Sequence, residues 1–556
     1  MDYINKGMMI MNKFEFNIIK IEEGITNLEI GLKKLDYPNT VDHELFKIAT
    51  MIGYYYAKSY NYKKAEYWLK SAIKTGFDTD KSWDTFLKLL VPNINTKKEE
   101  TYFWNNLDSN LDSLLDNLPV KITNPLLLDD SFYYGYYKFN PALILKKYTK
   151  IQRELFPLIS NNNVVSKIKV GFISSGFHPY AKLNNNLIHY SSLSDSFLPT
   201  ILKLNEELFD ITLLYYGLEK PNDYNGNNIF IPELLPNQQS IKQAQDIIKH
   251  KNLDILIFTD LHIKPILNYI ACSKLAKVQV CTHGHPITSG LPKHIMNYFI
   301  SWEEAEISTA QEHYTEELIL ISKNNTWEYY IPRNKKIDDS RYISLRNEKV
   351  WGNLERDELS FLPSNCNVKC NWYFCPQATF KFHYLFDEII FNILKLDTNG
   401  LIILIKNKEL YNLHELLINR MKENNIDINR IVFIEKLEHH NLMTMYQHSD
   451  VLLDSYFFGG DTTTREAFEI GTPIVTLPSK YLGGRWTMAY YTCMGITELI
   501  ANSINDYCNL AVKVATNKIF HNKIKSRILN NKHKLFYSEQ AIKSWENVLL
   551  KLYNNR

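Results

Sequence analysis

The segment Gly459-Gly460-Asp461-Thr462-Thr463-Thr464 has residue types suited to binding a phosphate group. Gly459 and Gly460 carry no side chain, so a ligand can approach their backbone closely. Thr462 and Thr463 bring hydroxyl groups beside the N–H groups of a first helical turn, which lack acceptors within the helix and carry a partial positive charge. The segment therefore predicts a seat for a diphosphate that needs no metal ion.

The same segment has a plainer interpretation as a glycine-containing turn between a strand and a helix, with a threonine as the N-cap. It is not a Walker loop, because no Gly-Lys-Ser/Thr follows, and its glycine spacing does not match the dinucleotide fingerprint. The helix is expected to stop at Gly471. Glu466, one helical turn after Thr463, would face the same mouth and could accept hydrogen bonds from ribose hydroxyls.

Two series of short apolar, β-branched runs alternate with helical patterns and must position this segment. The runs lie at 169–175, 211–217, 255–261, 278–284, 298–302 and 318–322, and then at 372–377, 401–406, 431–437, 451–457 and 473–478. Such alternation is typical of βαβ units with a parallel sheet covered on both faces. We therefore predict an α/β protein with two doubly wound domains, whose ligands bind beyond the carboxyl ends of the strands.

The chain before these runs has a helical pattern. In residues 46–76, Gly53, Ala65, Leu69 and Ala72 stand where a tetratricopeptide helix pair places its packing residues. A generic helical hairpin is an equal alternative. The predicted division is a helical, tetratricopeptide-like region at 1–110 and a helical or irregular linker at 111–166. Rossmann-like domains follow at 167–350 and 351–556.

Composition narrows the classes of function. A net charge of +2 implies no general attraction to nucleic acid or acidic membranes. No run approaches the roughly 18 apolar residues of a membrane span, and the N-terminus lacks the pattern of a signal peptide. Cys366, Cys370 and Cys375 are close together, but their spacing does not fit a zinc site. We expect a soluble cytoplasmic protein with reduced thiols and without a metal site.

Several blocks, in a fixed order, resemble the catalytic region of the O-linked N-acetylglucosamine transferase and SPINDLY family. They are SSGFHP at 174–179, GHPITSGLP at 284–292, CPQATFK at 375–381, Thr462-Thr463, GTPIVTLP at 471–478, Gly484-Arg485 and Met494-Gly495. The resemblance covers about residues 167 to 550. It implies the GT-B architecture, in which two Rossmann-like domains face a cleft.

The resemblance also implies roles for single residues. Those expected to bind a nucleotide sugar are Gly284, Gln377, Lys381, His439 or His440, Gly460, Asp461, Thr462, Thr463 and Glu466. Lys381 would neutralise charge on a departing diphosphate, although without the motif it would be taken for a solvated surface lysine. His178 is the first candidate, and His285 the second, for guiding the acceptor's proton, although a lone histidine is more often structural.

Two residues depart from the family pattern. Gly176 stands where the family has an aspartate, and Asp461 stands where the family often has a histidine. A carboxylate at residue 461 would lie near the expected phosphates, where it could hydrogen-bond a sugar hydroxyl instead. Only one tetratricopeptide-like unit is clear, so the acceptor is less defined than the donor.

The resemblance implies an inverting, metal-independent glycosyltransferase with no cofactor beyond the UDP-sugar co-substrate. The expected transfer is of N-acetylglucosamine from a UDP-sugar to a hydroxyl, such as Ser or Thr of a protein. Other donors (UDP-glucose or GDP-fucose) and other acceptors (a glycan or Asn) stay open. Gly176 and Asp461 motivate the alternative of a degenerate relative that binds a UDP-sugar or a partner without turnover. The order of the blocks argues against a nucleotide-sugar 2-epimerase or a phosphorylase.

Overall fold

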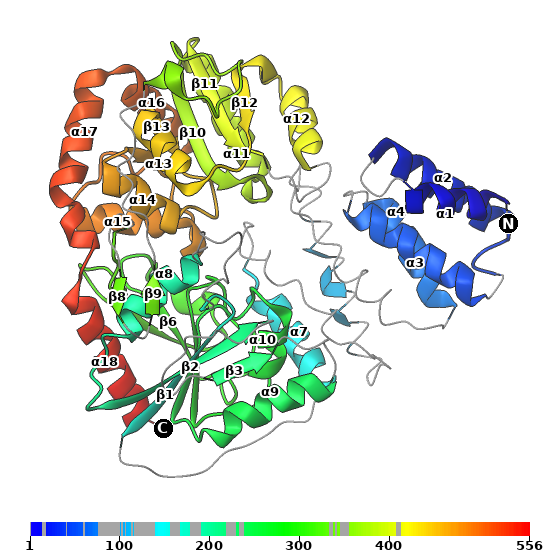
Figure 1. The fold of residues 1–556 in the computed structure, drawn as a ribbon, viewed down its shortest axis with the longest axis horizontal. Helices are drawn as coiled ribbons and strands as arrows, with labels where there is room; N and C mark the ends of the chain where they lie inside the picture. The colour runs from blue at the N-terminus through cyan, green and yellow to red at the C-terminus, as the bar shows by residue number, and fades with distance from the viewer. Residues whose placement is uncertain are drawn as a thin grey trace.

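The chain folds into a helical N-terminal part and two α/β domains (Figure 1). The computed structural model describes residues 2–13, 18–39, 42–58, 62–75, 140–155, 167–177, 191–217, 229–232, 238–332, 337–339, 342–344, 355–406 and 413–555, with a few further positions between 101 and 115.

The helical part consists of two helix pairs with the same kind of packing. The pairs are α1 (Asp2–Lys13) with α2 (Ile18–Lys34), and α3 (His43–Lys58) with α4 (Tyr62–Lys74). A side chain at Gly53 would meet Leu69, and one at Gly7 would meet Leu28, so each glycine lets a leucine of the partner helix approach its backbone. Buried Trp68 joins the two pairs by donating to Glu29 across 2.8 Å. The sequence had indicated only the second pair.

The first α/β domain is built on a parallel sheet in the order β3-β2-β1-β4-β5-β6-β7. Its strands are β1 (Ile168–Ser174), β2 (Phe209–Gly217), β3 (Ile229–Pro232), β4 (Ile255–Phe258), β5 (Val278–Thr282), β6 (Tyr298–Trp302) and β7 (Glu317–Ile321). Its helices are α7 (Ala142–Leu155), α8 (Ser192–Ile201), α9 (Gln238–His250) and α10 (Pro265–Ala271). The fully buried strands β4 and β5 explain the continuous apolar runs in the sequence. Six of these seven strands match predicted runs, and β3 was missed.

The second α/β domain has a parallel sheet in the order β12-β11-β10-β13-β14. Its strands are β10 (Asn371–Ala378), β11 (Gly400–Ile405), β12 (Ile431–Ile434), β13 (Val451–Leu453) and β14 (Ile474–Val475). Its helices are α11 (Tyr384–Leu396), α12 (Leu413–Glu423), α13 (His439–His448), α14 (Thr462–Ile470), α15 (Trp486–Met494), α16 (Ile504–Thr516) and α17 (Lys518–Asn531). A short antiparallel ladder of β8 (Ile337–Asp339) and β9 (Tyr342–Ser344) precedes this domain in the sequence.

Each sheet has a point where the strand order reverses, between β1 and β4 in the first and between β10 and β13 in the second. At such a point the loops after two neighbouring strands run in opposite directions and leave room for a ligand. Residues 375–381 comprise the last residues of β10 and the turn after it, and residues 454–461 follow β13. The two predicted phosphate-binding segments therefore lie side by side.

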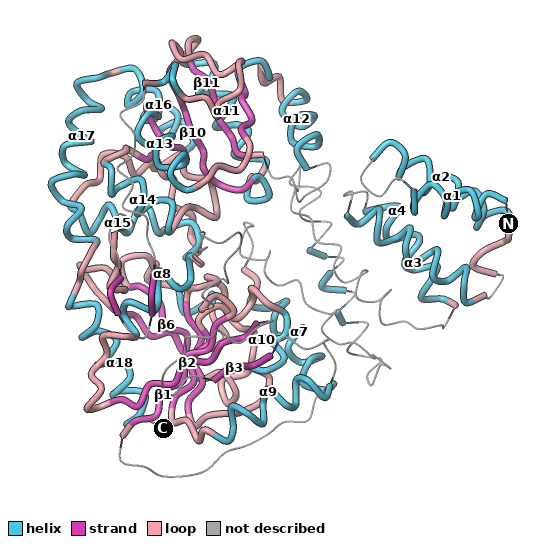
Figure 2. The backbone as a smooth tube through the Cα atoms, viewed as in Figure 1, coloured by secondary structure: helices cyan, strands magenta, loops and turns pink. Residues whose placement is uncertain are grey.

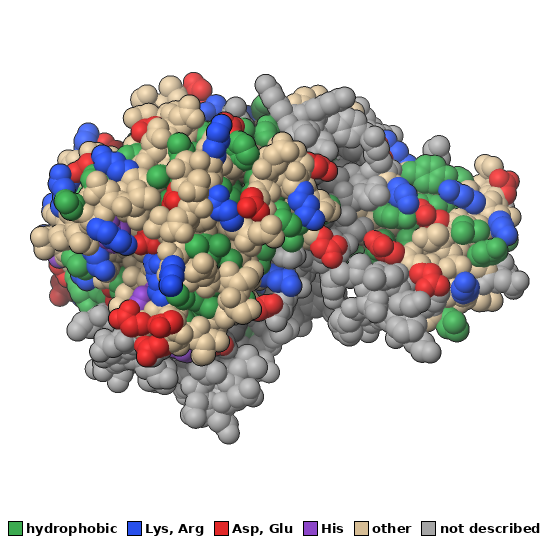
Figure 3. All heavy atoms as spheres, turned by 90° about the horizontal axis from the view of Figure 1, so that it is seen from above, with side chains coloured by type: hydrophobic (Ala, Val, Ile, Leu, Met, Phe, Trp, Pro, Cys, Tyr) green, Lys and Arg blue, Asp and Glu red, His purple; other side chains and the backbone are tan. Residues whose placement is uncertain are grey.

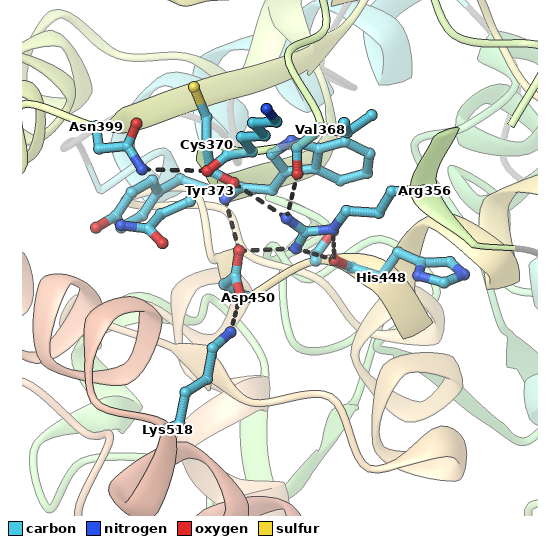
Figure 4. Close-up of polar contacts among 12 residues, drawn as sticks. Arg356, Val368, Cys370, Tyr373, Asn399, His448, Asp450 and Lys518 are labelled. Carbon is cyan, nitrogen blue, oxygen red and sulfur yellow. Dashed lines mark hydrogen bonds and ion pairs between the residues drawn. The ribbon is translucent and has the colours of Figure 1, made fainter. Parts of the chain in front are cut away.

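The opposite, amino-terminal end of the second sheet is fixed by buried Asp450 (Figure 4). Its carboxylate accepts from the Trp372 backbone at 2.8 Å, and pairs with Arg356 at 2.7 Å and Lys518 at 2.8 Å. Burial alone would raise the pKa of Asp450, but Arg356, together with hydrogen bonds from Lys518 and Trp372, holds it below its usual range. Asp450 thereby ties β10, β13 and α17 together away from the candidate site.

Loops that follow the carboxyl ends of strands connect the two α/β domains, which face each other in Figure 2. Arg485 Nε, which precedes α15, donates to the carbonyl of Ala305 after β6 at 2.5 Å. A side chain at Gly483 would meet Pro286, which follows β5. The loops that carry the candidate residues of the two domains therefore lie against each other.

The last helix, α18 (Glu539–Asn554), leaves the second domain and packs on α8, β4 and β7 of the first. Trp545 is buried there, donating from Nε1 to the carbonyl of Trp327 at 2.8 Å and facing the ring of Phe172. The division at residues 350 and 351 stays a prediction. It did not include this return of the chain to the first domain.

On the face drawn in Figure 3, Lys and Arg side chains are scattered among hydrophobic, uncharged and acidic ones. Within the described ranges, none of the helices is long and apolar enough to traverse a lipid bilayer.

Candidate functional site

The turn between β13 and α14 is built around buried Asp454, the first residue after the strand. Its Oδ1 accepts from the Gly460 N–H at 2.8 Å, and its Oδ2 accepts from the Thr476 hydroxyl at 2.8 Å. Burial raises the pKa of Asp454, and these hydrogen bonds oppose the rise. The carboxylate thus fixes the path of the chain from the strand to the helix.

At Gly459 and Gly460, neighbouring side chains come close to the backbone. A Cβ at Gly459 would lie 2.6 Å from Asp454 Oδ1, and one at Gly460 would lie 2.3 Å from Thr463 Oγ1 and 2.8 Å from Gln377 Nε2. The neighbouring residue Phe457 has φ +77°, a left-handed conformation in a non-glycine residue. The glycines therefore serve the packing of the turn, in addition to any access that they give to a ligand.

A chain of three polar side chains links the two loops at the strand reversal. Lys381 Nζ donates to Gln377 Oε1 at 2.8 Å, and Gln377 Nε2 donates to Thr463 Oγ1 at 2.8 Å. Lys381 also lies over the ring of Phe458, 4.6 Å from its centroid. Burial lowers the pKa of Lys381 to about 8, against the opposing effect of Asp454. The structure thus brings the predicted residues Gln377, Lys381 and Thr463 to the N-terminus of α14.

The N-cap of α14 is Asp461, so the threonine N-cap of the plainer interpretation is wrong. The Asp461 side chain makes no capping hydrogen bond. It accepts instead from Arg465 NH1 at 2.7 Å and from the Tyr490 hydroxyl at 2.5 Å. The helix ends at Gly471 with φ +85°, as predicted.

Glu466 is buried and faces His439, whose Nε2 lies 3.0 Å from Glu466 Oε1. Both histidines are exposed, and the His440 carbonyl accepts from the Thr444 hydroxyl at 2.9 Å. Of the two histidines that the sequence left open, the structure brings His439 to Glu466. The roles predicted for His439 toward uracil and for Glu466 toward ribose stay predictions.

From the first domain, the loop after β5 reaches the site. A Cβ at Gly284 would lie 2.2 Å from the Thr259 carbonyl oxygen, so this glycine is also a point of close packing. His285 is buried, with its ring 6.4 Å from that of Phe458 in the second domain. The predicted proton-guiding residue His178 lies outside the described residues. His285 is thus the candidate that the structure locates at the domain contact.

One departure from the family pattern has a steric explanation. A Cβ at Gly176 would lie 2.5 Å from Leu193 Cδ1 and 2.6 Å from Ser191 Oγ. The adjacent Ser175 is held by buried Asp260, which accepts from its N–H at 3.0 Å and from its hydroxyl at 2.5 Å. An aspartate at residue 176 would require α8 to move.

Sequence reasoning missed several residues that shape the site. Glu316 is buried directly before β7. It accepts from the Thr288 hydroxyl at 2.7 Å and from the Ser289 N–H at 2.7 Å, and so holds the loop that carries His285. Arg465 joins α14 to the first domain through Ser196. A charged residue one turn into the predicted helix was the available signal for Arg465, whereas nothing in the sequence indicated its partners. Among the described residues, no group of His, Cys, Asp and Glu is arranged to hold a metal ion.

Comparison with known proteins adds the family context. Residues 355–543 match glycosyl transferase family 41. The chain is 22% identical over 295 residues to the SPINDLY protein of Solanum lycopersicum, named as a UDP-N-acetylglucosamine–peptide N-acetylglucosaminyltransferase; the match covers 50% of this chain and 27% of the relative. It is 32% identical over 94 residues to the Caenorhabditis elegans UDP-N-acetylglucosamine–peptide N-acetylglucosaminyltransferase, covering 17% of this chain and 8% of that one. The chain thus spans 27% or less of the length of these relatives.

Among solved structures, an O-GlcNAc transferase from Thermobaculum terrenum has the same fold, with a TM-score of 0.64, 15% identity, and coverage of 100% of this chain and 98% of that one. The two-domain fold and the family 41 match define a protein of the GT-B glycosyltransferase class. Within that class, the chain is similar to the O-GlcNAc transferase and SPINDLY proteins, so the resemblance inferred from the sequence blocks is confirmed.

Proposed function

We propose that this protein transfers N-acetylglucosamine from UDP-N-acetylglucosamine to a hydroxyl group of a protein, with inversion at the anomeric carbon and without a metal ion. The observation that carries the proposal is the Lys381–Gln377–Thr463 chain beside the N-terminus of α14, within the segment that matches family 41. The names of the relatives supply the donor and the peptide acceptor.

In the proposed reaction, an acceptor oxygen attacks the anomeric carbon while the bond from that carbon to the UDP oxygen breaks on the opposite face. Negative charge then builds on the departing diphosphate. The Lys381 ammonium, the hydroxyls of Thr462 and Thr463, and the N–H groups at the start of α14 would stabilise this charge. This positive environment is the support for a reaction that needs no metal.

The acceptor must lose a proton as it attacks. His178 stays the first candidate for guiding that proton, and His285 the second, with the burial of His285 at the domain contact in its favour. Glu466 is proposed to bind the ribose hydroxyls, and His439, its hydrogen-bond partner, to lie toward the uracil. Gly284 and Gly460 let the donor approach the backbone.

A nucleotide-release assay tests the donor. The protein is incubated with UDP-N-acetylglucosamine, UDP-glucose and GDP-fucose, with and without EDTA, and the free nucleotide is measured. We expect the fastest release from UDP-N-acetylglucosamine and no effect of EDTA. Binding of UDP without release from any donor would instead indicate a protein that binds the nucleotide sugar without turnover, and loss of release in EDTA would contradict the metal-free mechanism.

Mass spectrometry of proteins co-expressed with the chain tests the acceptor. We expect additions of N-acetylhexosamine on Ser and Thr side chains, and none with a Lys381→Ala variant. Additions found on Asn, or on glycans alone, would overturn the proposed acceptor while leaving the proposed donor intact.

A further inference from the structure

Asp461 occupies the N-cap of α14 but does not cap the helix. An aspartate at this position ordinarily accepts hydrogen bonds from the N–H groups of the second or third helical residue. Here the side chain makes no such bond, and one fifth of it is exposed. Its carboxylate is instead held by Arg465, one turn along the helix, and by the hydroxyl of Tyr490.

Arg465 is fixed in place from both domains. Within the second domain it donates to Asp461 at 2.7 Å, to the Tyr490 hydroxyl at 2.9 Å and to Thr462 Oγ1 at 3.3 Å. From the first domain, Ser196 Oγ accepts from its NH2 at 3.1 Å, and its guanidinium lies 3.6 Å from the centroid of the Tyr330 ring. With only 5% of its surface exposed, Arg465 has little freedom to adopt another position.

The pairing changes what the start of α14 can bind. The first-turn N–H groups have no acceptors within the helix, so they are taken by a capping side chain, by water or by a ligand. A carboxylate that capped them would occupy the seat of an anion and repel it. Because Arg465 and Tyr490 draw the Asp461 carboxylate away and Arg465 neutralises its charge, the N–H groups next to Thr462 and Thr463 are left for another anion.

We propose that Arg465 is a positioning residue of the donor site, which holds the Asp461 carboxylate away from the N-terminus of α14 and so keeps that terminus open for the donor's diphosphate. The inference rests on the proposed function, because it takes the diphosphate of UDP as the anion. It also accounts for an aspartate at a position where a negative charge would otherwise oppose binding.

Calorimetric titration with UDP tests the inference in four proteins: the unaltered chain, Arg465→Met, Asp461→Ala and the double variant. In Arg465→Met the released carboxylate is free to cap the helix, so we expect UDP to bind at least about tenfold more weakly. Asp461→Ala should bind UDP at least as tightly as the unaltered chain, because the contact expected of this carboxylate is to the transferred sugar, which UDP lacks. The double variant, which has no carboxylate to misplace, should return to within about threefold of the unaltered chain.

This rescue separates positioning from general damage. If the double variant binds UDP as weakly as Arg465→Met, or if Arg465→Met binds normally, the inference is wrong. If the unaltered chain does not bind UDP at all, the proposed function fails first, and that outcome is distinct. Tyr490→Phe, which removes the second donor to Asp461 and keeps the arginine, should give a smaller loss in the same direction, and unchanged binding would count against the inference.

Arg356→Met is the matched control. Arg356 pairs with buried Asp450 at 2.7 Å in the same domain, but at the end of the sheet remote from the candidate site. Its loss should lower the thermal unfolding midpoint and leave the UDP affinity of the folded protein within about twofold. A tenfold loss of affinity in this control would show that any broken buried pair weakens binding, and would overturn the specific role of Arg465.

Discussion

Lys381 is held in an environment that makes its charge depend on pH. Burial lowers its pKa to about 8, so the ammonium form predominates at neutral pH and is lost as the pH rises through that value. If the ammonium stabilises the leaving diphosphate, kcat/KM should fall above about pH 8. A pH–rate profile measures this, and Lys381→Arg should move the fall to higher pH. A profile that stays level to pH 9.5 would contradict the role.

Removing the Lys381 side chain gives a second prediction. Lys381→Ala should lower kcat by more than about tenfold, because the charge on the departing diphosphate loses its cation. Steady-state kinetics with the preferred donor measures the effect. Lys395→Ala, at an exposed position on α11, is the control and should behave like the unaltered chain. Near-normal turnover of Lys381→Ala would show that this lysine is structural.

Gly460→Ala tests the turn itself. The added Cβ would come within 2.3 Å of Thr463 Oγ1 and 2.8 Å of Gln377 Nε2, so these two side chains must shift, and the hydrogen bond between them is disturbed. We expect UDP affinity to fall by about tenfold, measured by calorimetry. Gly495→Ala is the control, because its Cβ meets open space although its φ of +71° makes the substitution strained. It should cost stability, with no change in UDP affinity.

The sequence predicted which residues would meet at the site better than how each would be held. Gln377, Lys381 and Thr463 could be expected to converge, because the family resemblance assigned all three to the nucleotide-sugar site. The choice between His439 and His440 could not be made, because adjacent residues on a helix differ by about 100° in direction and the start of α13 was unknown. Arg465 could not be assigned because its partner Ser196 is 269 residues away in the chain.

At the scale of elements, Asp450 connects β10, β13 and α17 at the end of the sheet remote from the site. Asp450→Asn would leave Arg356 without its buried carboxylate, and we expect the free energy of unfolding to fall by about 3 kcal/mol at neutral pH. Urea unfolding followed by fluorescence measures this. Asp427→Asn, at an exposed turn where asparagine caps equally well, should change stability little.

The same residue predicts a dependence on pH with a definite sign. The pKa of Asp450 is lower in the folded protein than the value of about 3.9 expected in the unfolded chain. Its stabilisation is therefore complete above about pH 4 to 5 and is lost as the pH falls through the folded-state pKa. The difference in stability between the unaltered chain and Asp450→Asn should shrink between about pH 5 and pH 2. A constant difference would show that the ionised form is not what stabilises.

Among the strands, element prediction failed at β3, which has four residues, ends at Pro232 and forms the edge of the first sheet. Its length alone does not explain this, because the shorter strands β13 and β14 were found. The first helix pair was predicted only as part of the helical region at 1–110, and its close packing through Gly7 and Gly31 was not foreseen. The longer strands β1, β2 and β10 were found because burial on both faces leaves an unmistakable apolar run.

For the whole molecule, Trp545 is the main anchor of α18 on the first domain. Trp545→Ala removes a large buried side chain and its hydrogen bond to Trp327, at a cost of about 3–5 kcal/mol. Because the protein has several domains, the loss is best followed by hydrogen exchange in β4 and β7, the strands that α18 covers. We expect faster exchange there and little change in β11. Ile519→Ala, an exposed position on α17, is the control. Equal exchange in both sheets would show that α18 stabilises the molecule as a whole.

The sequence indicated the succession of two doubly wound domains but not the return of α18. Its amphipathic pattern predicts a helix with one apolar face, without stating which sheet that face covers. The contact depends on Trp327 and Phe172, which lie far back in the chain.

That return has a consequence for the order in which the protein is made. The ribosome completes β7 long before it reaches Trp545, and the entire second domain is synthesised in between. Until then, the apolar surface around Phe172 and Trp327 lacks its cover. Of the two α/β domains, the one that emerges first is therefore the one that is finished last, and it can be completed only after the second has been translated.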